Sequence, residues 1–225
     1  ELGYFYFKNE SDYQVSGFTV DREYIKESTF KDGLPVIAFE DVLSDFPPTE
    51  YEFFVAIGYT KLNQVRARKF FELKEMGYTL ASFISSKATN YAECRGANCF
   101  ILEDNTIQPF VRIGNNVTLW SGNHIGHHTR IDDHCFLASH IVISGRVHIS
   151  NSCFIGVNAT FRDQISIGEK CVIGAGTLLL SNVESEGVYI GRATERSKLP
   201  SSKALAEQPV SSFPVQSRLF NSVGR

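Results

Sequence analysis

The sequence lacks the features that mark several classes of protein. No run of about 18 apolar residues occurs in the 225-residue chain, which excludes a transmembrane helix. Lysine and arginine form no cluster and the formal net charge is −3, so we expect no nucleic-acid-binding surface. The five cysteines include no CxxC pair, and no secretory signal is recognisable. We therefore expect reduced thiols in a cytoplasmic protein.

Histidine is absent from most of the chain. The six histidines all lie within a short stretch and comprise His124, His127, His128, His134, His140 and His148. A solvated polar face explains any single member. The confinement of all six to one stretch favours a functional site.

Residues 12–82 have the pattern of an α/β domain. The apolar segment 53–58 (FFVAIG) is predicted to be a parallel strand buried on both faces, and residues 61–76 are predicted to form a helix that stops at Gly77. Shorter strands are expected at 13–21, 36–39 and 79–84. Residues 1–8 read as the end of an amphipathic helix, so we expect more of this domain before residue 1. The alternation indicates a small, open parallel sheet.

Ligands of such sheets bind at the carboxyl ends of the strands. Asp21 and Gly58 follow two of the predicted strands and are therefore candidates for a ligand-binding edge. A structural interpretation stays open for both residues, because Asp21 can simply end a strand and Gly58 can simply turn the chain.

From residue 101 the pattern changes to a strict period of six. Thirteen of the fourteen residues at this spacing are isoleucine or leucine: Ile101, Ile107, Ile113, Leu119, Ile125, Ile131, Leu137, Ile143, Ile149, Ile155, Phe161, Ile167, Ile173 and Leu179. A second column, four residues after each of these, holds mostly small or β-branched residues. This pattern is the hexapeptide signature of a parallel β-helix. Three hexapeptides close a triangular coil of about 18 residues, and each coil stacks on the last.

Residues 18 apart occupy the same place on successive coils. Cys135, Cys153 and Cys171 are related in this way and lie in an inward column. A stack of small apolar fillers explains them better than a zinc site, because nothing nearby favours the thiolates that a metal requires.

His127 and Gly145 are also 18 residues apart, at an outward position. A neutral imidazole can take a proton from an amine or hydroxyl nucleophile, and a backbone N–H one rung away can stabilise the oxyanion that forms. Glycine lets a thioester come close, since it has no Cβ. A base and an oxyanion donor together are the minimum requirement for acyl transfer.

The hexapeptide run, joined to an α/β region with Val20-Asp21-Arg22 and the 53–58 segment, resembles a known family. It is similar to the bacterial nucleotide-linked amino-sugar N-acetyltransferases of the bacillosamine and perosamine pathways and to the sialic acid O-acetyltransferases. The resemblance covers residues 12 to about 192. It implies a Rossmann-like domain followed by a left-handed β-helix, a homotrimer with active sites between subunits, and acetyl-coenzyme A as co-substrate.

The resemblance also implies roles for single residues. His127, in Ile125-Gly126-His127-His128, matches the catalytic base, and Gly145 matches the donor to the thioester carbonyl. Val157 and Ala175 match positions that contact the pantetheine arm of coenzyme A. The residues that match the lining of the nucleotide pocket are Asp21, Arg22 and Gly58.

The chain departs from the family directly after the base. Family members often carry a carboxylate there, whereas this sequence has His128, which we assign to the catalytic pair. A neutral imidazole can orient the base but does not stabilise an imidazolium as a carboxylate does. Asp132 or Asp133 is a candidate substitute. The glycine-rich loop that contacts nucleotide phosphates in relatives is absent from the chain.

The sequence thus predicts three parts. Residues 1–82 are expected to form a truncated Rossmann-like domain that binds a nucleotide sugar, residues 83–192 a left-handed β-helix acyltransferase domain, and residues 193–225 a tail rich in serine and proline. The leading function is acetyl transfer from acetyl-coenzyme A to the amino group of a nucleotide-linked 4-amino sugar, for the synthesis of surface polysaccharide or glycan.

Three other functions stay open. O-acetylation of sialic acid or a related sugar would use the same base and oxyanion donor. A metal-dependent lyase of the carbonic anhydrase type would need a histidine about two coils upstream of the cluster, and none precedes His124. A non-catalytic scaffold that binds a nucleotide sugar would explain the β-helix but not the histidines. We expect no metal cofactor.

Overall fold

The structure is a computed structural model that describes residues 1–193 and residue 196, without the side chain of Cys94. Glu1–Arg192 form one compact unit, and the remaining residues from Ala193 are a separate unit. The predicted tail lies almost entirely outside the described residues. The predicted domain boundary between residues 82 and 83 stays a prediction. We call residues 1–82 the N-terminal lobe.

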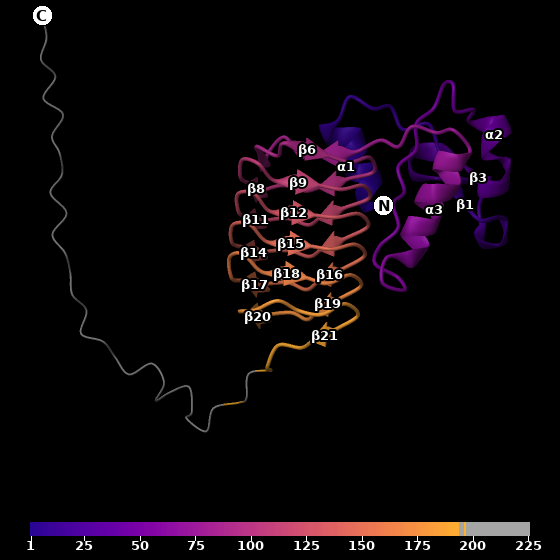
Figure 1. Ribbon diagram of the computed structural model, residues 1–225. Coiled ribbons are helices and arrows are strands. Elements are labelled where there is room, and N and C mark those ends of the chain that lie inside the picture. Colours follow the sequence, from indigo (N-terminus) through magenta and orange to yellow (C-terminus); the bar gives the residue numbers. More distant parts are fainter. Residues whose placement is uncertain (194–195, 197–225) are drawn as a thin grey trace, which may run out of the picture. The chain divides into compact units, whose positions relative to one another are not determined.

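The N-terminal lobe contains a small sheet and three α-helices (Figure 1). Strand β1 runs parallel to β3, and β2 pairs with β3 in the antiparallel direction, in the order β1-β3-β2. The predicted sheet is therefore present but mixed. The elements are α1 (Leu2–Glu10), β1 (Phe18–Val20), η1 (Arg22–Tyr24), β2 (Thr29–Phe30), η2 (Lys31–Gly33), β3 (Leu34–Ala38), η3 (Phe39–Asp41), α2 (Val42–Asp45) and α3 (Gln64–Glu75).

The predicted strand at 53–58 is wrong. Within this segment only Phe53 forms a β-bridge, to Leu80, and the strand pairing does not continue to Val55. The reason is a side chain, because Asn98 Oδ1 accepts the N–H of Val55 at 2.7 Å, where a neighbouring strand would otherwise pair. The predicted helix at 61–76 exists as α3, and Gly77 follows its end with φ +91°, a conformation that glycine adopts without strain.

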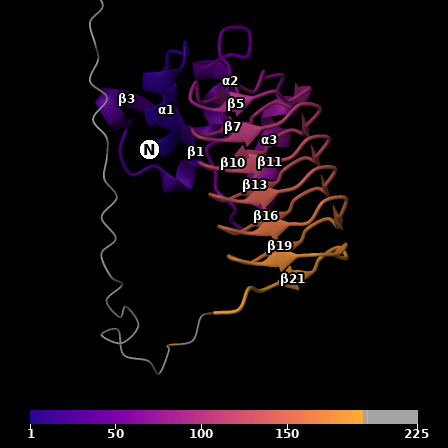
Figure 2. The ribbon, with the colours of Figure 1, turned by 90° about the vertical axis from the view of Figure 1, so that its left-hand side faces the viewer.

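The second part is a parallel β-helix with three flat walls (Figures 1 and 2). The seven-stranded wall holds β4 (Phe83–Ile84), β7 (Phe100–Ile101), β10 (Thr118–Leu119), β13 (Phe136–Leu137), β16 (Phe154–Ile155), β19 (Val172–Ile173) and β21 (Val188–Tyr189). The six-stranded wall holds β5 (Thr89–Asn90), β8 (Thr106–Ile107), β11 (His124–Ile125), β14 (Val142–Ile143), β17 (Thr160–Phe161) and β20 (Leu178–Leu179). The five-stranded wall holds β6 (Cys94–Arg95), β9 (Arg112–Ile113), β12 (Arg130–Ile131), β15 (His148–Ile149) and β18 (Ser166–Ile167).

The predicted register is confirmed from β7 to β20. Each strand's second residue is one of the six-spaced residues, and strands 18 residues apart pair in parallel, for example Leu119 with Leu137. The side chains at these positions fill the interior, and those from Ile101 to Ile173 are at most 2% exposed. Burial of this continuous apolar column is the main driving force for the fold. The fold class, a left-handed parallel β-helix behind a small α/β lobe, is confirmed.

Each corner of the regular coils holds one residue in the left-handed region. Positive φ values of +56° to +77° recur every sixth residue from Asn98 to Gly176. Asparagine, aspartate, histidine and glycine tolerate this conformation best. His128, His134 and His140 occupy such positions, so part of the histidine cluster has a structural reason.

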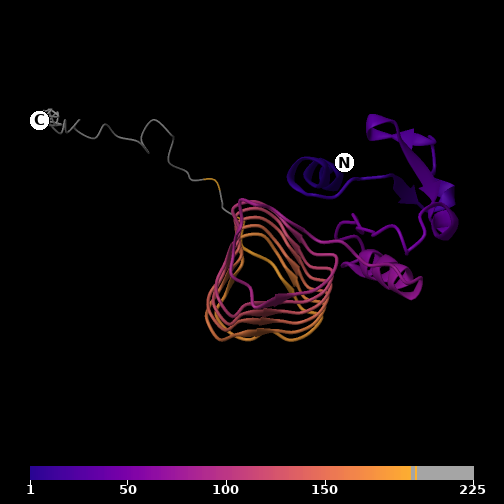
Figure 3. The ribbon, with the colours of Figure 1, turned by 90° about the horizontal axis from the view of Figure 1, so that it is seen from above.

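The N-terminal lobe packs on the seven-stranded wall, where Tyr6 contacts Phe100 and Tyr59 contacts Phe154. It also packs on the corner between the five- and seven-stranded walls, which we call the lobe corner (Asn98, Asn116 and His134) (Figure 3). Arg66 of α3 is only 1% exposed there and donates to Thr118 Oγ1 and to the carbonyl oxygen of Cys135 at 3.1 Å. No carboxylate faces it among the described residues, and burial lowers its pKa to about 10. The guanidinium therefore stays charged and is held by neutral oxygens.

Three side chains of the lobe corner form a hydrogen-bonded column. Asn98 Nδ2 donates to Asn116 Oδ1 at 2.7 Å, and Asn116 Nδ2 lies 2.9 Å from His134 Nδ1. Because an amide N–H faces Nδ1, His134 accepts there and carries its proton on Nε2. His134 is at a corner as expected but is 7% exposed, since Phe70 and Phe71 of α3 cover its ring.

Replacing Arg66 should destabilise the protein. We expect Arg66→Ala to lower the free energy of unfolding by about 3 kcal/mol, because it leaves buried oxygens without donors. Denaturant unfolding measures the change. Arg68→Ala, on the exposed side of the same helix, is the matched control and should cost less than about 0.5 kcal/mol. Equal effects of the two variants would contradict the anchoring role of Arg66.

His134 should make stability depend on pH. Burial lowers its pKa below the ordinary value of about 6.5, while Asp133 opposes this shift and Arg66 adds to it. The unfolded chain therefore binds more protons than the folded one below pH 6.5, and stability falls as the pH drops from there. His134→Asn suits the left-handed corner and cannot titrate, so its unfolding free energy should fall less between pH 7.5 and 5.5. If the unfolding free energy of the variant falls between pH 7.5 and 5.5 as much as that of the unaltered protein, His134 does not have this role.

Candidate active site

The predicted base lies in the turn between β11 and β12, at the corner between the six- and five-stranded walls. We call this the histidine corner (Phe110, His127, His128 and Gly145). The turn is fixed by its backbone, because the N–H of His127 donates to Gln108 Oε1 at 2.8 Å and the N–H of His128 donates to the carbonyl of Pro109 at 3.3 Å. His128 is the left-handed residue of the turn, with φ +59°.

The structure brings His127 and Gly145 together. A Cβ added to Gly145 would lie 2.7 Å from Cε1 and 2.8 Å from Nε2 of His127, so the ring lies directly against the glycine. No other residue type fits there without displacing the ring. The carbonyl of Gly145 accepts from Gln164 at 3.0 Å, whereas its N–H has no acceptor within the described part of the chain. An open amide donor thus lies beside an exposed imidazole.

The partner of His127 is its neighbour in sequence. Nδ1 of His127 lies 3.0 Å from Nδ1 of His128, and the two rings are perpendicular. Asp132 and Asp133, the candidate substitutes, contact other groups. Asp132 Oδ2 bonds His148 Nε2 at 2.8 Å, and Asp133 Oδ1 accepts the N–H of Asn115 at 2.7 Å. Neither carboxylate orients the base.

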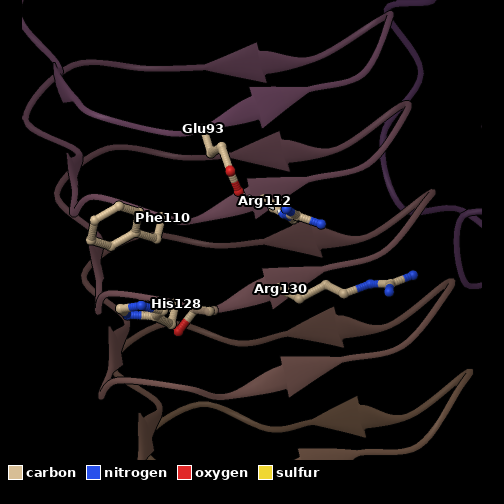
Figure 4. Close-up of a pocket in the computed structure, with 6 residues that line it drawn as sticks. Glu93, Phe110, Arg112, His128 and Arg130 are labelled. Carbon is tan, nitrogen blue, oxygen red and sulfur yellow. Dashed lines mark hydrogen bonds and ion pairs between the residues drawn. The ribbon is translucent and has the colours of Figure 1, made fainter.

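A shallow pocket opens beside this pair on the five-stranded wall (Figure 4). It is lined by Glu93, Phe110, Arg112, His128, Thr129 and Arg130. Glu93 Oε2 accepts from Arg112 Nε at 2.7 Å, and this guanidinium holds the pKa of the Glu93 carboxyl below its ordinary value. The sequence reasoning missed Glu93 because it precedes the regular repeat, and missed Phe110 because it is a turn residue rather than a core residue.

The predicted coenzyme contacts lie elsewhere on the same chain. Val157 and Ala175 are exposed and occupy the turns that join the seven- and six-stranded walls. This corner is one wall away from His127. A single chain therefore does not bring the predicted base and these residues together.

The predicted nucleotide residues also lie apart from His127. Asp21 follows β1 as expected and bonds Lys69 Nζ at 2.6 Å, while Arg22 bonds Asp41 at 2.7 Å. Around Gly58 the structure is open, with no atom within 4 Å of an added Cβ. All three belong to the N-terminal lobe, which packs on the lobe corner and not on the histidine corner (Figure 3).

The described residues include neither a membrane-spanning helix nor a metal-binding cluster. None of the helices in residues 1–193 is both long and apolar enough to cross a membrane. Among the same residues, no group of three or more histidine, cysteine or acidic side chains is arranged to hold a metal ion. The stacked cysteines Cys135 and Cys153 are buried, and their thiols donate to carbonyl oxygens of the next coil.

Comparison with known proteins agrees with the repeat and the fold. Residues 146–181 match the family model of the bacterial transferase hexapeptide (six repeats). No curated protein matches the chain in sequence. Solved structures do match. The fold is that of the hexapeptide-repeat transferases.

Three of the similar structures share the fold over most of the chain. WeeI from Acinetobacter baumannii AYE is 20% identical, with a TM-score of 0.71 over 84% of this chain and 89% of its own. The acetyltransferase domain of PglB from Neisseria gonorrhoeae FA1090, solved with acetyl coenzyme A, is 21% identical, with a TM-score of 0.69 over 78% and 82%. PerB from Caulobacter crescentus, solved with CoA and GDP-perosamine, is 23% identical, with a TM-score of 0.64 over 71% and 76%.

Gly145→Ala should move the ring of His127. The new Cβ would overlap Cε1 and Nε2, so the ring must turn away and the contact with His128 should be lost. Histidine NMR signals of both residues should shift in this variant. Gly3→Ala, where the nearest atom is at an ordinary 3.5 Å, is the matched control and should leave them unchanged. Unshifted signals in Gly145→Ala would mean that the ring does not lie against residue 145.

Proposed function

We propose that the protein transfers an acetyl group from acetyl-coenzyme A to the amino group of a nucleotide-linked sugar. The observation that carries the proposal is the contact between the exposed ring of His127 and Gly145, whose amide N–H has no acceptor in the described residues. The fold supports it, since PglB's domain was solved with acetyl coenzyme A and PerB with CoA and GDP-perosamine.

His127 and Gly145 each have a place in the proposed reaction. The amine nitrogen attacks the thioester carbonyl, and Nε2 of His127 takes the proton that the nitrogen loses. The N–H of Gly145 donates to the oxygen on which negative charge develops. The carbon–sulfur bond then breaks, coenzyme A leaves as the thiolate, and the proton taken up by His127 passes to the sulfur, so that the thiol forms and the base is neutral again. Sugar amide and free coenzyme A are the products.

A second copy of the chain is part of the proposal. Asp21, Arg22 and Gly58 lie on the lobe, and Val157 and Ala175 lie at a corner that His127 does not share. We propose that the chain acts as a homotrimer in which the lobe or corner of one copy faces the histidine corner of the next. The nucleotide would bind at Asp21, Arg22 and Gly58, and the pantetheine arm at Val157 and Ala175.

The acceptor is the open part of the proposal. A sugar hydroxyl, as in sialic acid, could replace the amine, because the same base and donor serve both. Purified protein with acetyl-coenzyme A should therefore be assayed against nucleotide-linked 4-amino sugars and against sialic acid, following thiol release. Release with an amino sugar supports N-acetylation, and release with sialic acid alone moves the assignment to O-acetylation. Release with neither acceptor contradicts both.

Removal of the base should abolish most of the turnover. We expect His127→Ala to lower kcat by roughly two orders of magnitude or more, since a positioned general base contributes about that much. The side chain is exposed, so thermal unfolding should be unchanged. Near-normal acetylation by this variant would remove His127 from the mechanism.

A further inference from the structure

Phe110 stands where a phenylalanine is unfavourable. It is 57% exposed, and its φ of +67° is a conformation that bulky residues rarely adopt. Other corners use asparagine at the same place, as at Asn116 and Asn158. Phe110 contributes nothing to the apolar interior, so its presence calls for another explanation.

The ring of Phe110 contacts the ring of His128. Their centroids are 4.7 Å apart with a tilt of 37°, and Phe110 lies one rung before His128 at the histidine corner (Figure 4). Nδ1 of His128 also lies 3.0 Å from Nδ1 of His127. His128 thus contacts both the proposed base and an aromatic ring.

The contact between the two imidazoles can hold only one proton. If His127 is to accept a proton at Nε2, its Nδ1 must carry the hydrogen and donate to Nδ1 of His128. His128 then carries its own hydrogen on Nε2. In the opposite arrangement Nε2 of His127 is protonated, and the ring cannot act as a base.

We propose that His128 and Phe110 are positioning residues for the base: His128 fixes His127 with Nε2 unprotonated, and the face of Phe110 stabilises the positive charge that the pair acquires. This inference rests on the proposed function for its kinetic consequences only. Aromatic faces attract cations through their quadrupole. The pair of residues would thus replace the carboxylate that often follows the base in the resembled family.

The proton balance is simple. Nε2 of His127 gains the proton of the nucleophile, and the hydrogen on its Nδ1 shifts to Nδ1 of His128. The positive charge then lies on His128 beside Phe110. The other charged groups that line the pocket are Glu93, Arg112 and Arg130. Glu93 and Arg112 form an ion pair, and Arg130 is paired with Asp132 at 2.5 Å, so their charges largely offset each other.

Phe110→Asn tests the charge without straining the fold. Asparagine suits the left-handed turn, so stability should be equal or higher. The pair should take up its proton about half a pH unit lower than in the unaltered protein, because a cation–π contact at an exposed site is lost. NMR titration of the histidine Cε1–H signals measures this without any substrate. Phe110→Trp should restore the midpoint. An unshifted midpoint in Phe110→Asn would overturn the role of Phe110.

Three variants of His128 test the orientation. Asp, Asn and Gly all tolerate φ +59°, so a purely structural corner would accept them equally. We expect His128→Gly to lower kcat/KM on the order of 10- to 100-fold, as for other groups that orient a histidine. His128→Asn should keep part of the activity and His128→Asp most of it, since both accept from Nδ1. Gln164→Gly, at the same place of the same corner with φ +59°, is the matched control.

The outcomes separate this inference from the proposed function. Equal activity of the three His128 variants, or 15N shifts that place the shared proton on His128 Nδ1 in the neutral protein, would overturn the inference. If the protein acetylates no acceptor, the proposed function fails, and the NMR midpoints and 15N shifts still decide the arrangement of the pair. If acetylation is found with unshifted midpoints, only the inference fails.

Discussion

The stacking of one coil on the next controls the rest of the structure. Each coil hydrogen-bonds to the next, as in the bond from the N–H of Gly126 to the carbonyl of Ile143 at 2.8 Å. Because one coil has about 18 residues and three walls, each wall with its corner takes six residues. This six-residue step places isoleucine and leucine inside and one left-handed residue at each corner from Asn98 to Gly176. Backbone spacing between rungs is about 4.8 Å, so a side chain on one rung must fit against the next. The fit of His127 against Gly145 is one consequence.

The β-helix could be read from the sequence because its core obeys one period. The first coil could not be predicted in the same way. Phe83 pairs with Phe100 and Thr89 pairs with Thr106, and the residues of each pair are 17 positions apart rather than 18. The turn at residues 91–93 is one residue shorter than the later turns, and the period slips there. The lobe was harder to predict. An apolar run at 53–58 looked like a strand, but pairing depended on Asn98, a residue 43 positions away.

The candidate site was predictable only where the 18-residue spacing applied. That spacing paired His127 with Gly145, whereas the contacts of His128 with His127 and Phe110 depend on side-chain rotation and turn geometry. Burial of His134 depended on α3 covering one corner. The residues assigned to the nucleotide and the coenzyme, Asp21 and Val157 among them, lie on other faces of the chain, and no sequence pattern specifies how copies meet.

The proposed reaction requires an amide donor and an imidazole that are both open to a substrate. A crystal structure of the assembled protein with a non-hydrolysable acetyl-coenzyme A analogue tests it most directly. The account predicts the analogue's carbonyl oxygen within about 3 Å of the Gly145 nitrogen, with Nε2 of His127 facing the acceptor side. An analogue bound away from the histidine corner, or a Gly145 amide covered by a neighbouring subunit, would contradict it.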